Sequence, residues 1–251
     1  MEELADLIRT KLAIQDATLT PTLAASQGSW QFPDAEPTAN KAVVISRSRY
    51  PLVGTAALEL APTPLHEQIL EFAKIALGYG YKQIELLPIF LLPGVHVRED
   101  IPGEVALAQQ SLGQTVVLKQ RPHLGFHPGL ATMLQRNLAT VKADAKILLS
   151  HGTRRRGGNQ VVEAVADYLG AVAAYWSVQP TLEEQITVLA GAGYQKIAIA
   201  PYFLFSGGIT DAIAQSVVSL QEQFSKLDLN LCNPIGVSGE LADLVVDLIE
   251  E

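Results

Sequence analysis

The sequence has a single cysteine, Cys232, among 251 residues. An internal disulfide is therefore impossible, and the cysteine content gives no sign of an oxidising compartment. No apolar run reaches the roughly 18 residues that a membrane helix needs. The first residues are acidic and polar, a pattern that argues against a secretory signal. These absences predict a cytoplasmic protein with no membrane partner.

Positive charge is also scarce, with 18 Lys and Arg against 26 Asp and Glu and a net charge of −8. General nucleic-acid binders are more often basic, so we set that class aside. Neither a dinucleotide-binding fingerprint nor a Walker loop occurs, and we expect no organic cofactor. With 48% hydrophobic and 18% charged residues, the composition is that of an ordinary globular protein of one or two domains.

Short apolar runs alternate with amphipathic helical patterns along most of the chain, which predicts mostly parallel sheets flanked by helices. A loop-rich insert, about 16–50, interrupts the pattern. Strands are predicted at 42–45, 55–61, 83–90, 114–119, 146–150, 171–177, 196–203 and 228–232. Helices are predicted at 2–14, 64–77, 104–111, 129–139, 159–169, 181–191, 211–224 and 241–248, with Thr63 capping the second and Thr181 opening a capping box in the sixth.

The two halves of the chain match each other, most clearly residues 78–91 with residues 191–204. We therefore predict an α/β protein of two similar lobes, 1–140 and 145–251. In the favoured register the helix at 2–14 corresponds to the helix at 159–169, so the first lobe lacks its opening strand and the loop after it. In a second placement the strand at 42–45 is the opening strand, and Ser46-Arg-Ser-Arg49 stands where His151-Gly-Thr-Arg154 stands.

Two histidines follow predicted strands. His96 lies in the segment Leu91–Pro102, and His151 opens a loop rich in glycine and arginine. Ligands bind at the carboxyl ends of strands in open α/β sheets. A neutral imidazole can bind a metal and accept a proton near neutral pH. Among the other histidines, His66 is expected at the surface of a helix, and for His127 a turn or capping role is favoured over ligand contact.

The motifs Leu-Leu-Ser-His151-Gly-Thr-Arg and Phe-Leu-Leu-Pro-Gly-Val-His96-Val-Arg-Glu-Asp-Ile-Pro together resemble the sirohydrochlorin chelatases, class II chelatases of the cobalto/ferrochelatase type, in their long two-lobe form. The resemblance covers nearly the whole chain outside about 16–50. It implies two α/β lobes facing each other across a cleft and a lyase of siroheme or cobalamin biosynthesis. Such an enzyme inserts a divalent metal substrate, Fe²⁺, Co²⁺ or Ni²⁺, into a tetrapyrrole that carries several carboxylates.

The resemblance also implies roles for individual residues. His96 and His151 are the expected catalytic residues and metal ligands, and Glu99 or Asp100 is expected to hold a histidine ring or a metal-bound water. Arginines pair with carboxylates through two parallel hydrogen bonds. The expected substrate-binding residues are Arg154, Arg155, Arg98, Gly94 and Gly152, with Arg156, Arg47 and Arg49 as further partners of the carboxylates.

The sequence departs from the family in one respect, because the two motif histidines usually belong to one lobe and here fall in different lobes. Either His96 and His151 meet at a common site, or the chain begins late and a strand ending in His-Gly-Ser-Arg lies upstream of Met1. The alternative function is that of a degenerate chelatase, which holds a tetrapyrrole or a metal without turnover. The sequence is compatible with both a monomer and a homodimer.

Overall fold

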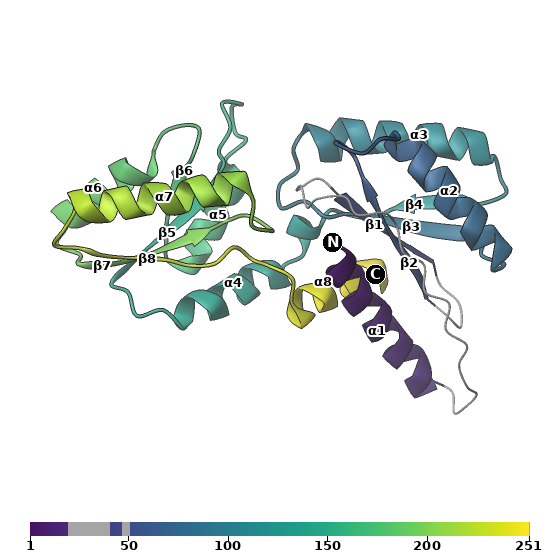
Figure 1. The fold of residues 1–251 in the computed structure, drawn as a ribbon, viewed down its shortest axis with the longest axis horizontal. Coiled ribbons are helices and arrows are strands. Elements are labelled where there is room, and N and C mark those ends of the chain that lie inside the picture. Colours follow the sequence, from purple (N-terminus) through teal and green to yellow (C-terminus); the bar gives the residue numbers. More distant parts are fainter. Residues whose placement is uncertain (20–40, 47–50, 251) are drawn as a thin grey trace. The chain divides into compact units, whose positions relative to one another are not determined.

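The computed structural model describes residues 1–19, 41–46 and 51–250. The contacts divide the chain into unit 1, residues 1–127 with 237–251, and unit 2, residues 128–236. Each unit contains one four-stranded sheet with helices on both of its faces (Figure 1). The predicted α/β class with two similar lobes is confirmed. Within the described ranges, no helix is long and apolar enough to cross a bilayer.

Unit 1 has the strand order β2-β1-β3-β4. Its strands are β1 (Lys41–Ser46), β2 (Leu52–Ala57), β3 (Gln83–Pro88) and β4 (Val117–Gln120). Its helices are α1 (Glu2–Leu19), α2 (Leu65–Gly78), α3 (Ile101–Leu112) and α8 (Gly239–Glu250), with a π-helical turn η1 (His96–Asp100) and a 3₁₀ turn η2 (Leu124–Phe126).

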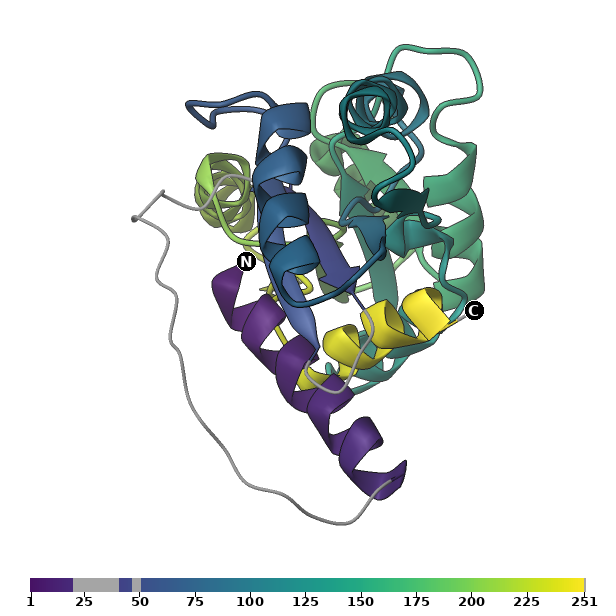
Figure 2. The ribbon, with the colours of Figure 1, turned by 90° about the vertical axis from the view of Figure 1, so that its right-hand side faces the viewer.

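The two faces of the unit 1 sheet are covered by different helix pairs. Helices α2 and α3 lie on one face and pack on Ile84 and Leu86 of β3 (Figures 1 and 2). Helices α1 and α8 lie on the other face and pack on each other, α1 also on β2 and α8 on β3. Side chains alternate between the two faces along a strand, and residues 84–88 of β3 are all buried. Because both faces of β3 are covered, these residues are apolar except for Glu85.

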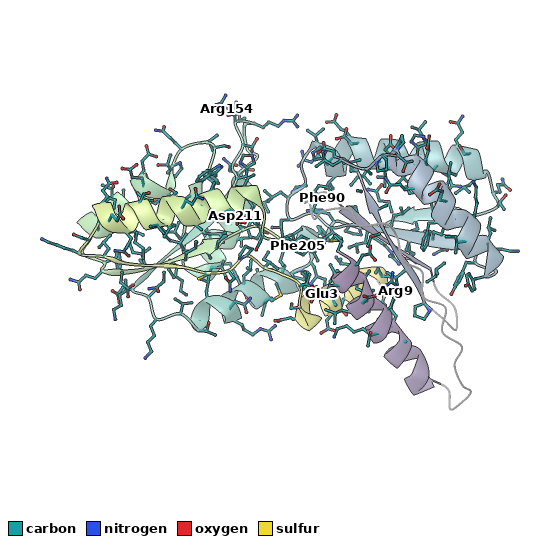
Figure 3. All side chains as sticks on the ribbon, viewed as in Figure 1. Glu3, Arg9, Phe90, Arg154, Phe205 and Asp211 are labelled. Carbon is teal, nitrogen blue, oxygen red and sulfur yellow. The ribbon has the colours of Figure 1, made fainter. Side chains whose placement is uncertain are left out.

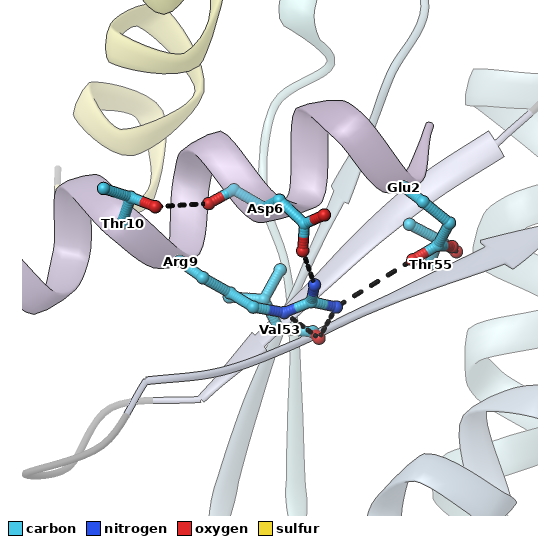
Figure 4. Close-up of polar contacts among 6 residues, drawn as sticks. All are labelled: Glu2, Asp6, Arg9, Thr10, Val53 and Thr55. Carbon is cyan, nitrogen blue, oxygen red and sulfur yellow. Dashed lines mark hydrogen bonds and ion pairs between the residues drawn. The ribbon is translucent and has the colours of Figure 1, made fainter. Parts of the chain in front are cut away.

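Helix α1 is tied to the edge strand β2 through one arginine (Figure 4). The Nε and Nη2 atoms of Arg9 donate to the carbonyl oxygen of Val53 at 3.1 and 2.7 Å. The carboxylate of Asp6 accepts from the same guanidinium, and Glu2 lies 4.0 Å from it. Arg9 thus satisfies a backbone group at the edge of the sheet and fixes the helix along it.

Unit 2 has the strand order β6-β5-β7-β8, and all its strand pairs are parallel. Its strands are β5 (Ala145–Ser150), β6 (Val172–Tyr175), β7 (Lys196–Pro201) and β8 (Asp228–Leu231). Its helices are α4 (Gly129–Ala139), α5 (Gln160–Leu169), α6 (Leu182–Gly191) and α7 (Gly208–Gln223). Helices α6 and α7 share one apolar cluster with the sheet. Helix α5 packs on β5 and β6, and α4 packs on α5.

The position of the opening strand in unit 1 is filled by a strand that runs the opposite way. β1 lies between β2 and β3, as β5 lies between β6 and β7, but β1 is antiparallel to both neighbours. Ala42 pairs with Pro88 at the carboxyl end of β3, whereas Ser46 pairs with Leu52 at the other end of the sheet. Ser46 therefore does not stand where His151 stands, and that part of the second placement is wrong. Arg47 and Arg49 lie outside the described residues.

The last helix of each half packs in the other unit. Helix α4 follows β4 in the chain but packs on α5 of unit 2, where Thr132 lies 3.4 Å from the hydroxyl of Tyr168. Helix α8 follows β8 but packs on α1 of unit 1, where Lys11 and Asp243 form an ion pair. The expected division near residue 140 differs from this grouping, because a linear repeat does not reveal which copy of a sheet a helix joins.

Glutamines cover all four edge strands, and this device is repeated in the two units. Gln68 accepts from the backbone nitrogen of Ala57 and donates to its oxygen, at 2.9 and 2.8 Å. Gln109 bonds the backbone of β4 and the residue before it in the same way. On the edges of unit 2, Gln221 does the same for β8 and the residue before it, and Gln185 donates to the oxygen of Ala173 in β6. An uncovered edge strand exposes backbone groups that can pair with another chain, so these side chains protect each sheet.

The predicted helix caps have different outcomes. Thr181 forms the predicted capping box with Glu184. Thr63 is not a cap, because Pro64 holds the cap position of α2 without a side-chain hydrogen bond. A carboxylate from α3 serves that helix end instead: Glu104 accepts from the backbone nitrogen of His66 at 2.9 Å and lies 2.8 Å from its Nδ1. Burial acts to raise the pKa of Glu104, but the hydrogen bonds from His66 outweigh it and the pKa is lowered.

A buried ion pair joins β3, β4 and α8. The carboxylate of Glu85, which is 3% exposed, accepts from Nε of Arg121, which is 9% exposed. Nη2 of Arg121 donates to the carbonyl oxygen of Ile249 at 2.6 Å, and Gln83 donates to the second oxygen of Glu85 at 3.0 Å. Removing one member of such a pair leaves a buried charge without its partner.

We predict that Arg121→Met destabilises the protein by about 3–5 kcal/mol, because the variant leaves Glu85 buried without the guanidinium that pairs with it. The free energy of unfolding from urea denaturation measures this loss. The double variant Glu85→Leu with Arg121→Met removes both charges and should recover most of it. A single variant within about 1 kcal/mol of the wild type would show that the pair does not hold these elements together.

Candidate functional site

The loop after β3 places His96 at the start of a helix rather than in an open loop. The backbone nitrogen of Gly94 donates to Leu92 at 2.8 Å, and that of Arg98 donates to Gly94 at 3.1 Å. The turn η1 then continues into α3. The expected loop to Pro102 is therefore shorter than predicted. A Cβ added to Gly94 would meet no atom within 4 Å, so packing does not require glycine there.

His96 has a carboxylate beside each ring nitrogen. Its Nδ1 lies 2.7 Å from Oδ2 of Asp100, and its Nε2 lies 3.6 Å from Oε1 of Glu59, which follows β2. A carboxylate only accepts hydrogen bonds, so Nδ1 donates to Asp100, while Nε2 points toward Glu59. The ring of Phe90 lies 6.0 Å away, and the imidazole is 37% exposed. Asp100 thus fixes the orientation of the ring, with Nε2, a nitrogen suited to metal binding, on the side of Glu59.

The separation of Nε2 and Oε1 suits two ligands of one ion. Ligands about 2.1 Å from a tetrahedral metal lie about 3.4 Å apart, close to the observed 3.6 Å. Of the two predicted carboxylates, Asp100 contacts the ring and Glu99 is exposed. The sequence analysis missed Glu59, because the sequence does not show that β2 and β3 lie on either side of β1. Its one signal was a carboxylate near the end of the strand predicted at 55–61.

The loop after β4 packs against the loop that carries His96. The backbone nitrogen of Gly125 donates to Phe90 at 2.8 Å, and a Cβ at Gly125 would lie 1.8 Å from the oxygen of Leu91. This contact requires glycine. His123 stands at the start of the same loop. Burial lowers the pKa of His123, and the positive charge of Arg98 lowers it further.

The other two histidines of unit 1 make contacts between elements. Nε2 of His127 lies 3.6 Å from Asp247 of α8, with 10% of its side chain exposed. His66 is paired with Glu104 of α3 and is partly buried rather than on the open surface. Both contacts hold helices in place.

In unit 2 the backbone around His151 is fixed while its side chain is exposed. The backbone nitrogen and the hydroxyl of Ser177 both donate to the carbonyl oxygen of His151 at 2.9 Å. Gly152 has φ +80°, and a Cβ there would lie 2.7 Å from Cβ of Tyr175 and from Val178. Glycine is therefore needed for this turn, which brings the loop against the strand β6.

The arginines of the same loop stand on a backbone that one asparagine closes. Asn159 accepts from the nitrogen of Thr153 at 3.0 Å and donates to its oxygen at 3.2 Å. The arginines between them are exposed, and Figure 3 shows Arg154 at the tip of the loop. Three guanidinium groups on a closed loop form a positively charged surface that suits carboxylates.

The predicted site residues fall into two sets. Unit 1 contains Gly94, His96, Arg98, Glu99 and Asp100. Unit 2 contains His151, Gly152, Arg154 and Arg155. The structure brings His96 together with Asp100 and adds Glu59, and it gathers the unit 2 residues on one loop. A common site for His96 and His151 stays a prediction. In the part of the chain that the structure describes, no group of three or more His, Cys, Asp or Glu could hold a metal.

Comparison with known proteins decides the family. The family model named CbiX matches residues 24–141 and 145–251, one match for each half of the chain. The chain belongs to the CbiX family. The double match agrees with the internal repeat and with the two similar sheets.

The chain is also similar to proteins named as chelatases, at low sequence identity. The sirohydrochlorin cobaltochelatase of Priestia megaterium is 26% identical over 68% of this chain, and the match spans 61% of that protein. The sirohydrochlorin ferrochelatase of the same organism is 23% identical over 78% of this chain and 76% of its own length. Among solved structures, SirB from Bacillus subtilis with Fe³⁺ has a TM-score of 0.65 at 19% identity, covering 78% of this chain and 80% of that one. The last likeness shows a shared fold.

We predict that His123 makes the protein less stable as the pH falls below about 6.5. In the folded state its pKa is lowered from the ordinary histidine value of about 6.5, so below that pH the unfolded chain binds more protons and the folded state loses stability. Above it, neither state is protonated at this ring and the contribution vanishes. His123→Asn should flatten the dependence of the free energy of unfolding on pH, measured by urea denaturation between about pH 7.5 and about pH 5.5. An unchanged slope would contradict the burial of this ring.

Proposed function

We propose that this chain is a cytoplasmic lyase that inserts a divalent metal, Fe²⁺, Co²⁺ or Ni²⁺, into sirohydrochlorin. In this reaction two pyrrole N–H bonds break, four bonds from nitrogen to metal form, and two protons leave. Membership of the CbiX family and the similarity to sirohydrochlorin cobaltochelatase and ferrochelatase support this substrate. The arrangement around His96 supports the chemistry, and it is the observation on which the proposal mainly rests.

The pair of His96 and Glu59 is suited to a metal in transit. It offers one nitrogen and one oxygen, 3.6 Å apart. A structural metal site, by contrast, has four protein ligands and no open position. Water and then the pyrrole nitrogens fill the remaining positions. Imidazole and carboxylate together bind iron, cobalt and nickel in the divalent state, so the pair accepts each of the three metals. Few protein ligands make the release of the metal to the ring easier.

The other residues divide the remaining work. His151 is the second proposed metal ligand and proton acceptor, since a neutral imidazole takes up a proton near neutral pH. Arg154, Arg155 and Arg98 bind carboxylates at the rim of the tetrapyrrole through paired hydrogen bonds. Carboxylates gather around His96, and guanidinium groups gather near His151 in the sequence of unit 2. The metal cation thus meets carboxylates, and the polyanionic tetrapyrrole meets guanidinium groups.

We predict that the protein metallates sirohydrochlorin with Co²⁺ or Fe²⁺ faster than the metal alone does, followed by the absorbance of the tetrapyrrole. His96→Ala should lower kcat/KM by about 100-fold or more, because it removes the ligand that first holds the metal. Glu59→Gln and Asp100→Asn should each lower it by about 10- to 100-fold, the first by weakening the carboxylate ligand and the second by loosening the orientation of the His96 ring.

The matched control is Glu71→Gln, which removes an exposed carboxylate of α2 and should leave the rate unchanged. Full activity of His96→Ala would contradict the role of this imidazole. A wild type that binds sirohydrochlorin tightly but never exceeds the blank rate would instead identify a tetrapyrrole-binding protein without turnover.

A further inference from the structure

Leu60 adopts a backbone conformation that leucine rarely takes. Its φ is 62°, and it is the one non-glycine residue with positive φ in the ranges that the structure describes. The left-handed region brings Cβ close to the following carbonyl oxygen, so a residue other than glycine, asparagine or aspartate is strained there. Such strain persists where the surrounding structure enforces it, and it is concentrated at functional sites.

The side chain of Leu60 gains nothing from the folded protein that would offset this strain. It is 82% exposed, the highest value among the large apolar residues of the described chain. Its neighbours are placed differently, since Leu58 packs against the core of unit 1 and Glu59 faces His96. A strained backbone and an aliphatic group in water therefore coincide at the residue beside the proposed metal ligand.

The loop around Leu60 is stiff. Residues that precede proline are restricted to extended conformations, which applies to Ala61 before Pro62 and to Thr63 before Pro64. Nε2 of Gln68 donates to the oxygen atoms of both Ala57 and Thr63 at 2.8 Å, so the two ends of the loop are tied together. These restraints limit the conformations that the loop at Leu60 can adopt.

The corresponding loop of unit 2 shows that the fold does not need leucine here. When residues 55–61 are matched with residues 172–178, Leu60 falls on Ser177 and Glu59 on Trp176. Ser177 has a structural task, because its hydroxyl donates to the oxygen of His151. The exposed leucine therefore occurs in the unit that carries the His96 and Glu59 pair.

We propose that Leu60 is a positioning residue that packs on the face of the tetrapyrrole and holds the ring over the Nε2 atom of His96. The inference rests on the proposed function. A tetrapyrrole is flat and apolar on its faces and carries its carboxylates at the rim, and a metal enters through a face. The protein group beside the entering metal must therefore contact an apolar surface without binding the metal itself. An aliphatic side chain meets both conditions.

The test is Leu60→Asn in the full chain. Asparagine tolerates the left-handed region, so the backbone is retained while the aliphatic contact is lost. The KM for sirohydrochlorin, and its Kd in a titration without metal, should rise about tenfold, the loss expected for one leucine contact. We expect kcat to stay within about twofold, the affinity for Co²⁺ alone to be unchanged, and the melting temperature to be equal to or above that of the wild type.

The control is Tyr79→Asn, which removes an apolar group that is 64% exposed at the C-terminal end of α2 and should change neither constant. A KM and a Kd of Leu60→Asn equal to those of the wild type would overturn the role of Leu60 while leaving the chelatase function in place. A wild type that binds sirohydrochlorin without metallation would overturn the function, and the Kd of the variant would still decide on Leu60. A wild type that does not bind sirohydrochlorin would overturn both.

Discussion

The ion pair between Glu85 and Arg121 is the contact on which the arrangement of unit 1 depends. It lies between β3 and the end of β4, and Arg121 also binds the carbonyl oxygen of Ile249 near the end of α8. The loops that follow β3 and β4 carry His96 and His123 and pack on each other through Gly125. Because both charges are buried, separating them would leave each without its partner charge, so the pair favours one relative position of these strands. The loop that carries His96 starts at the end of β3, one of these strands.

The loops that follow β2 and β3 give the imidazole of His96 a defined orientation. Asp100 holds the Nδ1 side of His96, and Glu59 faces Nε2 from the end of β2. The order of the strands makes this possible. Strands β2 and β3 flank β1, and the loops that follow their carboxyl ends supply Glu59 and His96. In unit 2 the same architecture carries His151 on a loop closed by Asn159 and bearing three arginines. A duplicated fold has thus acquired an acidic environment at one histidine and a basic loop at the other.

The sequence predicted the features that local patterns determine. The match of residues 78–91 with residues 191–204 corresponds to β3 and β7, and the capping box at Thr181 is present. It did not predict features that depend on which distant segments meet. The direction of β1, the exchange of α4 and α8 between the units, and the contact of Glu59 with His96 are of this kind. The positive φ of Leu60 was also invisible, because leucine is not a residue that signals such a turn.

The central claim is that Nε2 of His96 and a carboxylate oxygen of Glu59 are ligands of the incoming metal. Anomalous diffraction at the cobalt edge from crystals soaked in Co²⁺ tests it most directly. The account predicts a peak about 2.1 Å from both atoms, with Asp100 remaining on the Nδ1 side of the ring. A cobalt ion bound to Nδ1, or cobalt bound elsewhere in the protein with His96 still paired only with carboxylates, would contradict the account.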